Sequence, residues 1–471
     1  MDRRRFLFRG GQYGLGFLGL QAFALGCKPT TSPDTNQTPG KLHYGYGALQ
    51  EDPEGILNLP EGFSYKIISR KGTPMSDGFL VPGAADGMAT FEAPGDKVMI
   101  IRNHEVSPGD IEGGPFGPQK ELLSRISPDK VYDFGKGVHP CMGGTTTLIY
   151  DPSTQMVETE YLSLAGTIRN CAGGRTPWNS WLTCEEDTSP PNSEREKWHG
   201  YVFEVPTSNV PSLADPIPIK EMGRFNHEAV CVDPRSSIVY LTEDRGDGLI
   251  YRFLPNTKNN LHNGGKLQVL AIKGHPGFET RNWADLPGDK MEIGKKYEVE
   301  WLDIDGVDAP EDDLRYRGFA KGAARFARGE GIWYGDGDFY FACTNGGQLE
   351  HGQIFHYTLS PNEGTSGELN NPPTLEIFIE PNDTDLVESC DNLTIAAHGD
   401  LVICEDKPTP RIVGVTPEGG VYHIGKNVGY KSEFAGATFS PDGKTLFVNI
   451  QGPGLTLAIT GPWDKRKGEL I

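Results

Sequence analysis

The chain has 471 residues, with 44 Lys and Arg against 64 Asp and Glu, and a formal net charge of −20 at pH 7. An acidic balance of this size argues against nucleic acid or an anionic membrane surface as the main partner. Gly (61) and Pro (36) together make up about a fifth of the chain, against about 12% in average proteins. Because helix interiors tolerate neither residue, the composition predicts many short strands joined by tight turns.

The first residues are typical of an export signal. Residues 3–7 (RRRFL) place consecutive arginines before Phe and Leu, and residues 13–26 form a weakly apolar run that is too short to span a bilayer. Arginines in this position, followed by a Gly-rich and mildly hydrophobic stretch, resemble a twin-arginine (Tat) signal. We therefore expect an exported protein, periplasmic or on the cell surface, that is handled by the Tat export machinery.

A second processing signal overlaps the end of this segment. Residues 24–27 (ALGC) resemble a lipoprotein cleavage box with Cys27 as the acylated residue, although Ala24 stands where Leu is usual. Lipidation would tether the protein to a membrane, and export without a tether is the alternative. Residues 28–40 are rich in Pro, Thr, Ser and Asn, as solvated linkers are. We expect a Tat-type signal peptide over 1–27, a flexible linker over 28–40 and one folded domain over 41–471.

Seven further cysteines follow Cys27, and in an exported protein an odd number leaves at least one thiol unpaired. Cys171 does not belong to an apolar strand pattern, so it needs an explanation other than packing. Four others do lie in such patterns and are predicted to be small core residues: Cys184, Cys231, Cys343 and Cys404.

One layout recurs six times along the chain. Each copy consists of a strand, a turn rich in Asp, Pro or Gly, and an alternating apolar strand that ends in polar residues. The first strands begin near Asp86, Cys171, Glu228, Glu330, Asp391 and Gly436. The second strands cover residues 97–105, 179–187, 237–245, 338–346, 399–407 and 444–452.

These pairs predict an all-β fold, and their number favours a six-bladed β-propeller with irregular loop insertions. Third strands follow several pairs, for example over 200–205, 248–253 and 352–357, and no amphipathic helix is evident between them. A β-sandwich is the competing architecture, but it does not explain why the same polar ending recurs. Residues 63–70 precede the first pair and could close the last blade beside residues 456–460.

The polar ends of the pairs predict a metal site. In a hairpin the start of the first strand lies beside the end of the second, and blades around an axis would bring these ends to one mouth of the channel. Carboxylates that close together cannot all stay ionised without positive charge among them. The pattern places there Asn103, His104, Glu105, Cys171, Glu185, Glu186, Glu228, Glu243, Asp244, Arg328, Glu330, Asn345, Asp391, Asn392, Glu405, Asp406 and Asn449.

The residue types leave the identity of the cation open. Carboxylate and amide oxygens suit hard cations such as Ca²⁺, and a thiolate with carboxylates can also hold iron or zinc. The alternative for any one polar strand end, such as Asn345, is an ordinary solvated turn. Paired acids recur at residues 185–186, 243–244 and 405–406, and this recurrence argues against that alternative.

Several motifs occur in a fixed order: 103–105 (NHE), 170–173 (NCAG), 176–178 (TPW), 183–186 (TCEE), 225–229 (FNHEA), 243–244 (ED), 328–330 (RGE), 344–345 (TN) and 391–393 (DNL). With these residues the region from about residue 42 to the C-terminus resembles the PhoX family of alkaline phosphatases. The resemblance implies a Tat-exported six-bladed propeller that hydrolyses phosphate monoesters at a cluster of ferric iron (Fe³⁺) and calcium (Ca²⁺) with a cysteine ligand. Gly329 is a departure, because Pro is expected in the family's Arg-Pro-Glu motif.

The resemblance also implies a role for each residue. Cys171 and Arg328 are the expected catalytic residues, Cys171 as the iron ligand and Arg328 as the clamp on substrate phosphate. Asn103 and Asn345 are expected to bind substrate as well. The expected metal ligands are Cys171, Glu105, Glu185, Glu186, Glu228, Asp244, Glu330 and Asp391, with one of Glu185 and Glu186 sufficing. The implied reaction is in-line phosphoryl transfer by a metal-activated oxygen, on a small-molecule phosphate ester.

Two other functions fit a propeller with bound cations. A lactonase-like propeller hydrolase needs fewer ligands and no thiolate, so Cys171 distinguishes it from a phosphatase. A non-catalytic calcium-binding propeller needs no arginine facing the metal ions, so Arg328 distinguishes that alternative.

Overall fold

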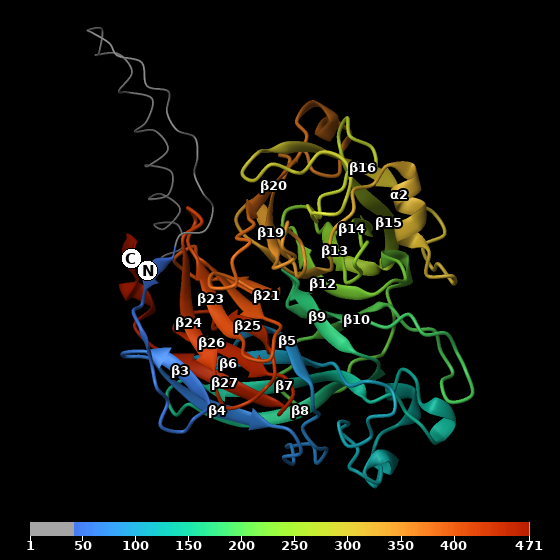
Figure 1. Ribbon diagram of the computed structural model, residues 1–471. Coiled ribbons are helices and arrows are strands. Elements are labelled where there is room, and N and C mark those ends of the chain that lie inside the picture. Colours follow the sequence, from blue (N-terminus) through green and yellow to red (C-terminus); the bar gives the residue numbers. More distant parts are fainter. Residues whose placement is uncertain (1–41, 471) are drawn as a thin grey trace, which may run out of the picture. The chain divides into compact units, whose positions relative to one another are not determined.

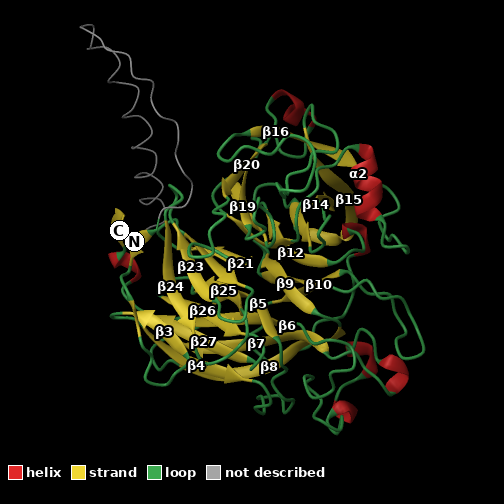
Figure 2. Ribbon diagram, viewed as in Figure 1, coloured by secondary structure: helices red, strands yellow, loops and turns green. Residues whose placement is uncertain are grey.

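Antiparallel hairpins dominate the computed structural model, which describes residues 42–470. The expected signal peptide, lipoprotein box and linker lie outside the described residues. Strands are the main regular structure of the described chain, and the few helices lie at its margins (Figure 2). The all-β class predicted from the composition is therefore confirmed.

The strands form sheets in which neighbours along the chain usually pair. The first two sheets come from the N-terminal half of the domain. One contains β5 (Ala85–Ala93), β6 (Lys97–His104), β7 (Gly143–Asp151) and β8 (Met156–Thr167), and the next contains β9 (Asn170–Arg175), β10 (Ser180–Glu185) and β11 (Val202–Pro206).

A nine-stranded sheet follows, in which β16 and β20 join two successive sets of strands. The first set is β12 (His227–Val232), β13 (Val239–Glu243), β14 (Ile250–Thr257), β15 (Asn260–Ile272) and β16 (Tyr297–Asp303). The second set is β17 (Gly329–Tyr334), β18 (Asp338–Cys343), β19 (Gln353–Thr358) and β20 (Thr374–Ile379).

The C-terminal sheets recruit strands from the start of the domain. One combines β21 (Cys390–Ile395), β22 (Leu401–Glu405), β23 (Arg411–Val415) and β24 (Val421–Asn427) with β3 (Leu57–Pro60) and β2 (Leu49–Gln50). Another combines β25 (Phe434–Phe439), β26 (Thr445–Ile450) and β27 (Leu455–Thr460) with β4 (Ser64–Arg70), and β1 (His43–Gly45) pairs with β28 (Lys467–Leu470).

The pairing of β4 with β27 confirms the predicted closing strand. Ser64 lies opposite Thr460 and Ser69 opposite Thr456, so the beginning of the domain completes a sheet built by its end. This pairing ties the two ends of the domain together, as in the closed ring of a propeller.

The first strand of each hairpin contacts the first strand of the next, and the series returns to its start. β5 contacts β9, β9 contacts β12, and the contacts continue through β17, β21 and β25 back to β5. Several of these strands gather in the middle of the view in Figure 1. The sheets thus surround an axis, and the fold is propeller-like.

Tight turns and apolar strands explain why these segments form hairpins. Gly399 and Gly443 have φ of +96° and +72° in the turns that precede β22 and β26, a conformation that strongly favours glycine. The predicted core cysteines (Cys184, Cys231, Cys343 and Cys404) are buried within strands, as expected. One short helix, α2 (Leu314–Lys321), was not anticipated from the sequence. Within the described residues no helix combines the length and apolar character needed to cross a membrane.

Close packing of the first strands narrows the channel along the axis. A Cβ atom on Gly87 would lie 2.6 Å from the Cα of Ala172, and one on Gly331 would lie 2.7 Å from the Cα of Asn392. The backbones approach this closely because the positions carry no side chain. Only about 20 Å³ remains in the cavity lined by these glycines and their neighbours. The channel is therefore nearly closed between the first strands, and a site at the end of the channel would have little open space beneath it.

Candidate active site

In each of the repeated hairpins, one backbone hydrogen bond joins the first and second strands at the same end. The residue after the second strand donates its N–H to the carbonyl of the residue before the first strand. We call these the trailing and leading residues, and the residue two positions after the leading one is the inner residue. The bonds are Glu105 to Ala84 (2.8 Å), Glu186 to Arg169 (2.9 Å), Asp244 to Asn226 (3.2 Å), Thr344 to Arg328 (3.1 Å), Asp406 to Ser389 (2.9 Å) and Gln451 to Glu433 (3.3 Å).

Just beyond this bond, each first strand carries an extra residue relative to its partner. In β5 and β6, Ala85 lies opposite His104 but Met88 lies opposite Arg102, so the register slips by one. The same slip occurs in the other hairpins. Such β-bulges bend a strand and redirect its side chains. The inner residue lies within the bulged segment in five hairpins, and the bulge follows it in the last one.

The leading, inner and trailing residues line one cavity of about 180 Å³. Every residue that lines it occupies one of these three positions. The leading residues are Arg169, Arg328 and Glu433; the inner residues are Asp86, Cys171, Glu228, Glu330 and Asp391; and the trailing residues are Glu105, Glu186, Asp244, Asp406 and Gln451. The predicted convergence of the strand ends on one site is therefore confirmed.

The lining carries far more acid than base. Among the described residues it contains nine carboxyl groups and one thiol against two guanidinium groups. Burial, and then the charge of Asp244, raises the pKa of Glu186 to about 8. Burial, and then the neighbouring Asp406, raises the pKa of Glu433 to about 10.

The innermost groups are shifted in the same direction. Burial and neighbouring carboxylates raise the pKa of Glu228, Glu330, Asp391 and Asp86 well above the ordinary values. Burial, followed by the charge of Glu228, also raises the pKa of the Cys171 thiol. The protein alone thus disfavours the ionised forms, and a bound cation would favour them.

Two groups of side chains have the spacing of a metal site. Cys171, Glu186 and Glu228 place ligand atoms within 4.8 Å of one another, and so do Glu228, Glu330 and Asp391. Glu228 belongs to both groups, so two cations could share it. Three carboxylates suit a hard cation, whereas a thiolate with two carboxylates suits a transition metal. The donor set therefore fits the metal ions that the sequence resemblance implies.

Two arginines supply the positive charge of the cavity. Arg328 donates from Nε to Asp244 Oδ1 at 2.8 Å and from Nη2 to Glu330 Oε1 at 2.9 Å. Arg169 forms ion pairs through Nη2 with Glu105 Oε1 at 2.5 Å and with Glu186. Both residues have positive φ, +53° for Arg328 and +45° for Arg169. A non-glycine residue in this region is strained, and such strain often marks functional sites.

Glu185 is the predicted metal ligand that the structure places elsewhere. It is the last residue of β10, and successive strand residues point to opposite faces, so Glu186 faces the cavity and Glu185 does not. The Glu185 carboxylate accepts from His199 Nδ1 at 2.7 Å and from the Gly200 amide at 2.9 Å. Glu243 and Glu405 occupy the same position and also accept from backbone amides, of Leu249 and Glu388 respectively. These glutamates hold adjoining chain segments.

The two predicted substrate-binding asparagines also lie outside the lining. Asn103 donates to the carbonyl of Ala172 at 2.7 Å, and its Oδ1 accepts from Trp181 Nε1 at 2.8 Å. It therefore fixes the backbone next to Cys171. Asn345 follows the trailing residue of its hairpin, and its carbonyl accepts from Trp283 Nε1 at 2.6 Å.

The other residues with an implied role do meet in the cavity: Cys171, Glu105, Glu186, Glu228, Asp244, Arg328, Glu330 and Asp391. Asp406, which the pattern placed at the same mouth, lines the cavity as well, whereas His104, Asn392 and Asn449 do not. Four lining residues were not predicted: Asp86, Arg169, Glu433 and Gln451. Asp86 shares the inner position with predicted ligands, so applying the repeat uniformly would have found it. Gln451 donates to both Asp86 (2.9 Å) and Glu105 (2.8 Å), which ties the last hairpin to the first.

A third group of potential ligands, Asp133, Cys141 and His199, lies outside the cavity. Asp133 Oδ2 already accepts from the amides of Glu196 (2.8 Å) and Lys197 (2.9 Å). His199 lies between Asp133 and Glu185. The group is therefore satisfied by the protein itself.

A propeller-like fold with a carboxylate-rich cavity at one end of its axis suits the class of metal-binding propellers. The family model described as "Alkaline phosphatase PhoX" matches residues 44–454. The chain belongs to this family and is a metal-dependent phosphatase. No curated protein matches the chain.

The chain is similar to several solved structures. The structure of Pseudomonas fluorescens PhoX in complex with vanadate, a transition state analogue, is 18% identical, with a TM-score of 0.61 over 90% of this chain and 98% of that chain. The periplasmic gluconolactonase of Pseudomonas aeruginosa is 12% identical, with a TM-score of 0.40 over 86% and 95% of the two chains. A gluconolactonase of Xanthomonas campestris is also 12% identical, with a TM-score of 0.39 over 84% and 95%.

Proposed function

We propose that this protein hydrolyses phosphate monoesters at the cavity, with a transition metal ion held by Cys171, Glu186 and Glu228 and a hard cation held by Glu228, Glu330 and Asp391. The observation that carries the proposal is the presence of Glu228 in both ligand groups. By the family resemblance, the first cation is iron and the second is calcium. Asp244 and Glu105 are candidates for additional ligands, because both line the cavity.

The size of the cavity supports a phosphoryl group as the reacting part. About 180 Å³ is below the roughly 300–1,000 Å³ of sites that enclose drug-sized ligands. Small ions and a phosphoryl group fit, while the organic part of a larger ester would remain outside. Bound cations would supply Lewis-acid charge and activation of an attacking oxygen.

Arg328 is proposed to bind the phosphoryl group. Its side chain is 34% exposed, and its Nε and Nη2 atoms are held by Asp244 and Glu330. The guanidinium group is thereby fixed before substrate arrives, which lowers the entropy lost on binding. Arginine presents paired N–H donors that match phosphate oxygens, so it can stabilise charge as the ester bond breaks.

The wider setting follows the sequence and the repeat of the hairpins. We propose that the propeller has six blades, one for each of the hairpins that contribute leading, inner and trailing residues. We also propose that the protein is exported through the Tat machinery and acts in the periplasm or at the cell surface, with Cys27 as the site of a lipid anchor.

The proposal is tested with two variants of the metal-loaded protein. Cys171→Ala and Arg328→Ala are each expected to lower kcat/KM for an aryl phosphate by at least about 100-fold, since each removes a ligand or a charged contact. Metal analysis should show a loss of the transition metal in Cys171→Ala and parent-like content in Arg328→Ala. Cys184→Ala is the control, because Cys184 is a fully buried thiol outside the cavity. Parent-like hydrolysis in Cys171→Ala would refute the assignment.

A further inference from the structure

Arg169 matches Arg328 in every feature that suits Arg328 to bind an anion. Both are leading residues of their hairpins, both line the cavity, and both have side chains that are 34% exposed. Each lies beside one of the two ligand groups, Arg169 through Glu186 and Arg328 through Glu330. One arginine therefore lies beside each of the two groups of proposed metal ligands.

The two arginines also leave the same donor available. Arg169 uses Nη2 for Glu105 and Glu186 and Nε for the Glu186 carbonyl at 3.4 Å. Arg328 uses Nε and Nη2 for Asp244 and Glu330. Among the described residues, no hydrogen bond involves Nη1 of either arginine.

Four buried arginines outside the cavity differ on this point. Arg411 donates from Nε to Glu405, from Nη1 to the Asp385 carbonyl and from Nη2 to the Thr384 carbonyl. Arg252, Arg224 and Arg102 likewise use Nε, Nη1 and Nη2. The side chain of Arg102 is 0% exposed and that of Arg252 is 3% exposed. These four buried arginines thus use all three nitrogens, whereas Arg169 leaves Nη1 without an acceptor. Among the described residues Arg235 and Arg245 also leave Nη1 without an acceptor, but they do not line the cavity.

We propose that Arg169 is a second phosphate-binding arginine, which donates from Nη1 to an oxygen of the phosphoryl group that Arg328 also contacts. The proposal rests on the proposed function, because it assumes a phosphoryl group in this cavity. Glu105 and Glu186 hold the guanidinium group of Arg169 as Asp244 and Glu330 hold that of Arg328. The surrounding carboxylates repel a negatively charged phosphoryl group. Arginine donors on two sides of the group offset this repulsion, so the second arginine contributes to affinity in a cavity rich in acid.

The first test maps arginine modification in the metal-loaded parent protein. Phenylglyoxal reacts with accessible guanidinium groups, and mass spectrometry reports the extent at each arginine. Inorganic phosphate is expected to slow the modification of Arg169 and Arg328 about tenfold or more, and to leave Arg245 unaffected. Arg245 is a matched control, because its side chain is 36% exposed and contacts Asn226 and Asp312 without lining the cavity. Equal modification of Arg169 with and without phosphate would overturn the proposal.

The second test separates anion binding from a merely structural role. Arg169→Lys keeps the positive charge beside Glu105 and Glu186 but removes the fixed Nη1 donor. We expect parent-like metal content and thermal stability, with KM for an aryl phosphate and the inhibition constant of phosphate both raised about tenfold to 100-fold. Arg245→Lys should change neither constant. An unchanged inhibition constant in Arg169→Lys with full metal content would also overturn the proposal, and loss of metal leaves the decision to the modification experiment.

These outcomes are distinct from failure of the proposed function. If the parent protein hydrolyses no phosphate ester, the proposed function fails whatever Arg169 does. If the parent is active and phosphate protects Arg328 but not Arg169, only the present inference fails.

Discussion

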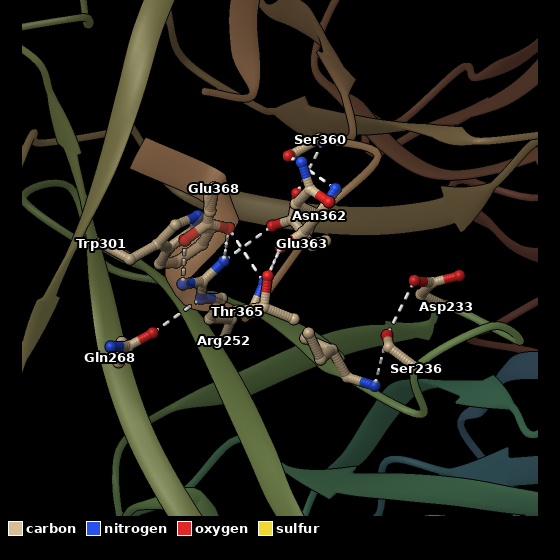
Figure 3. Close-up of polar contacts among 12 residues, drawn as sticks. Asp233, Ser236, Arg252, Gln268, Trp301, Ser360, Asn362, Glu363, Thr365 and Glu368 are labelled. Atoms are coloured by element: carbon tan, nitrogen blue, oxygen red, sulfur yellow. Dashed lines mark hydrogen bonds and ion pairs between the residues drawn. The ribbon is translucent and has the colours of Figure 1, made fainter. Parts of the chain in front are cut away.

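Two buried charged regions of this protein are built in opposite ways. Around Arg252, Glu363 Oε1 accepts from Nη1 at 2.7 Å and Glu368 Oε2 accepts from Nη2 at 2.8 Å, while Gln268 holds Nε (Figure 3). The ring of Trp301 covers the guanidinium carbon at 4.7 Å. Each donor of Arg252 therefore has an acceptor, and the cluster needs no ligand.

The axial cavity, in contrast, has too few donors for its acids. Its nine carboxyl groups share two arginines, and the pKa values of most of the acids are raised by burial and mutual repulsion. Burial alone would raise the pKa of Glu368, yet hydrogen bonds to Arg252 hold it below the ordinary value of 4.5. Glu363 in the same cluster still has a pKa raised by burial. The two regions therefore differ in whether the protein supplies enough donors for its acids, rather than in the direction of every pKa shift.

Removing the metal ions should produce the largest effect. In the metal-free protein, Glu186 and Glu433 have pKa values raised from 4.5 to about 8 and about 10. A raised pKa means that the unfolded chain ionises first, so stability is fully present below pH 4.5 and is lost as the pH rises through these values. The free energy of unfolding of the metal-free protein should therefore fall by several kcal/mol between about pH 4.5 and 10.

Chemical denaturation of chelator-treated and metal-loaded protein across this pH range measures the effect. Metal-loaded protein should not show the decline, because bound cations favour the ionised acids and stabilise the folded state by mass action. If the free energy of unfolding changed with pH in the same way in both forms, the view that the cavity binds cations would be contradicted.

The next largest effect concerns two neighbours on one strand, Glu185 and Glu186. Glu185→Gln breaks a buried ion pair with His199 and is expected to cost about 3–5 kcal/mol of stability. Its metal content should remain parent-like, since Glu185 does not line the cavity. Glu186→Gln should do the opposite: it removes a ligand of the Cys171 group and lowers metal content and hydrolysis by at least about tenfold.

Denaturation of the metal-free forms completes this comparison. There Glu186→Gln should be more stable than the parent at pH 8 or above, because it removes an acid whose ionisation opposes folding. If Glu185→Gln lost metal and Glu186→Gln did not, the alternation of strand faces assigned to β10 would be wrong.

Much of the site was predictable because it follows the chain repeat. The hairpins, the closing strand and most of the residues that line the cavity, including Glu228 and Glu330, were expected from strand ends alone. The choice between Glu185 and Glu186 was not, since it depends on which residue is the last of β10, and strand ends are the hardest boundaries to read from sequence. Glu433 was missed because it occupies the leading position, where the residue type varies from hairpin to hairpin, for example Ala84 and Ser389.

Arg169 shows a different limit. Its guanidinium reaches the cavity from a backbone with φ of +45°, and the sequence contains no Gly or Asn there to signal that conformation. Among the leading residues, Ala84, Arg328 and Ser389 also have positive φ. Because Ala, Arg and Ser all adopt this conformation at the leading position, the residue type does not set it, and a residue-by-residue reading of the sequence cannot find it.

The smallest effect tests the closed cluster and should have the opposite dependence on pH. Glu368→Gln keeps the shape of the side chain but removes a charged acceptor of Arg252, which should cost about 1–2 kcal/mol at pH 7. Because the pKa of Glu368 is lowered in the folded state, its contribution is present above pH 4.5 and is lost as the pH falls through its folded value. Urea denaturation of parent and variant at pH 7 and pH 3 should show this difference shrinking at the lower pH. Glu158→Gln, which alters an exposed pair with Lys97, is the control and should change stability by less than about 0.5 kcal/mol at both values. If the stability cost of Glu368→Gln instead grew toward low pH, the Arg252 cluster would resemble the cavity. It would then be a second charged region whose charges the protein does not balance by itself.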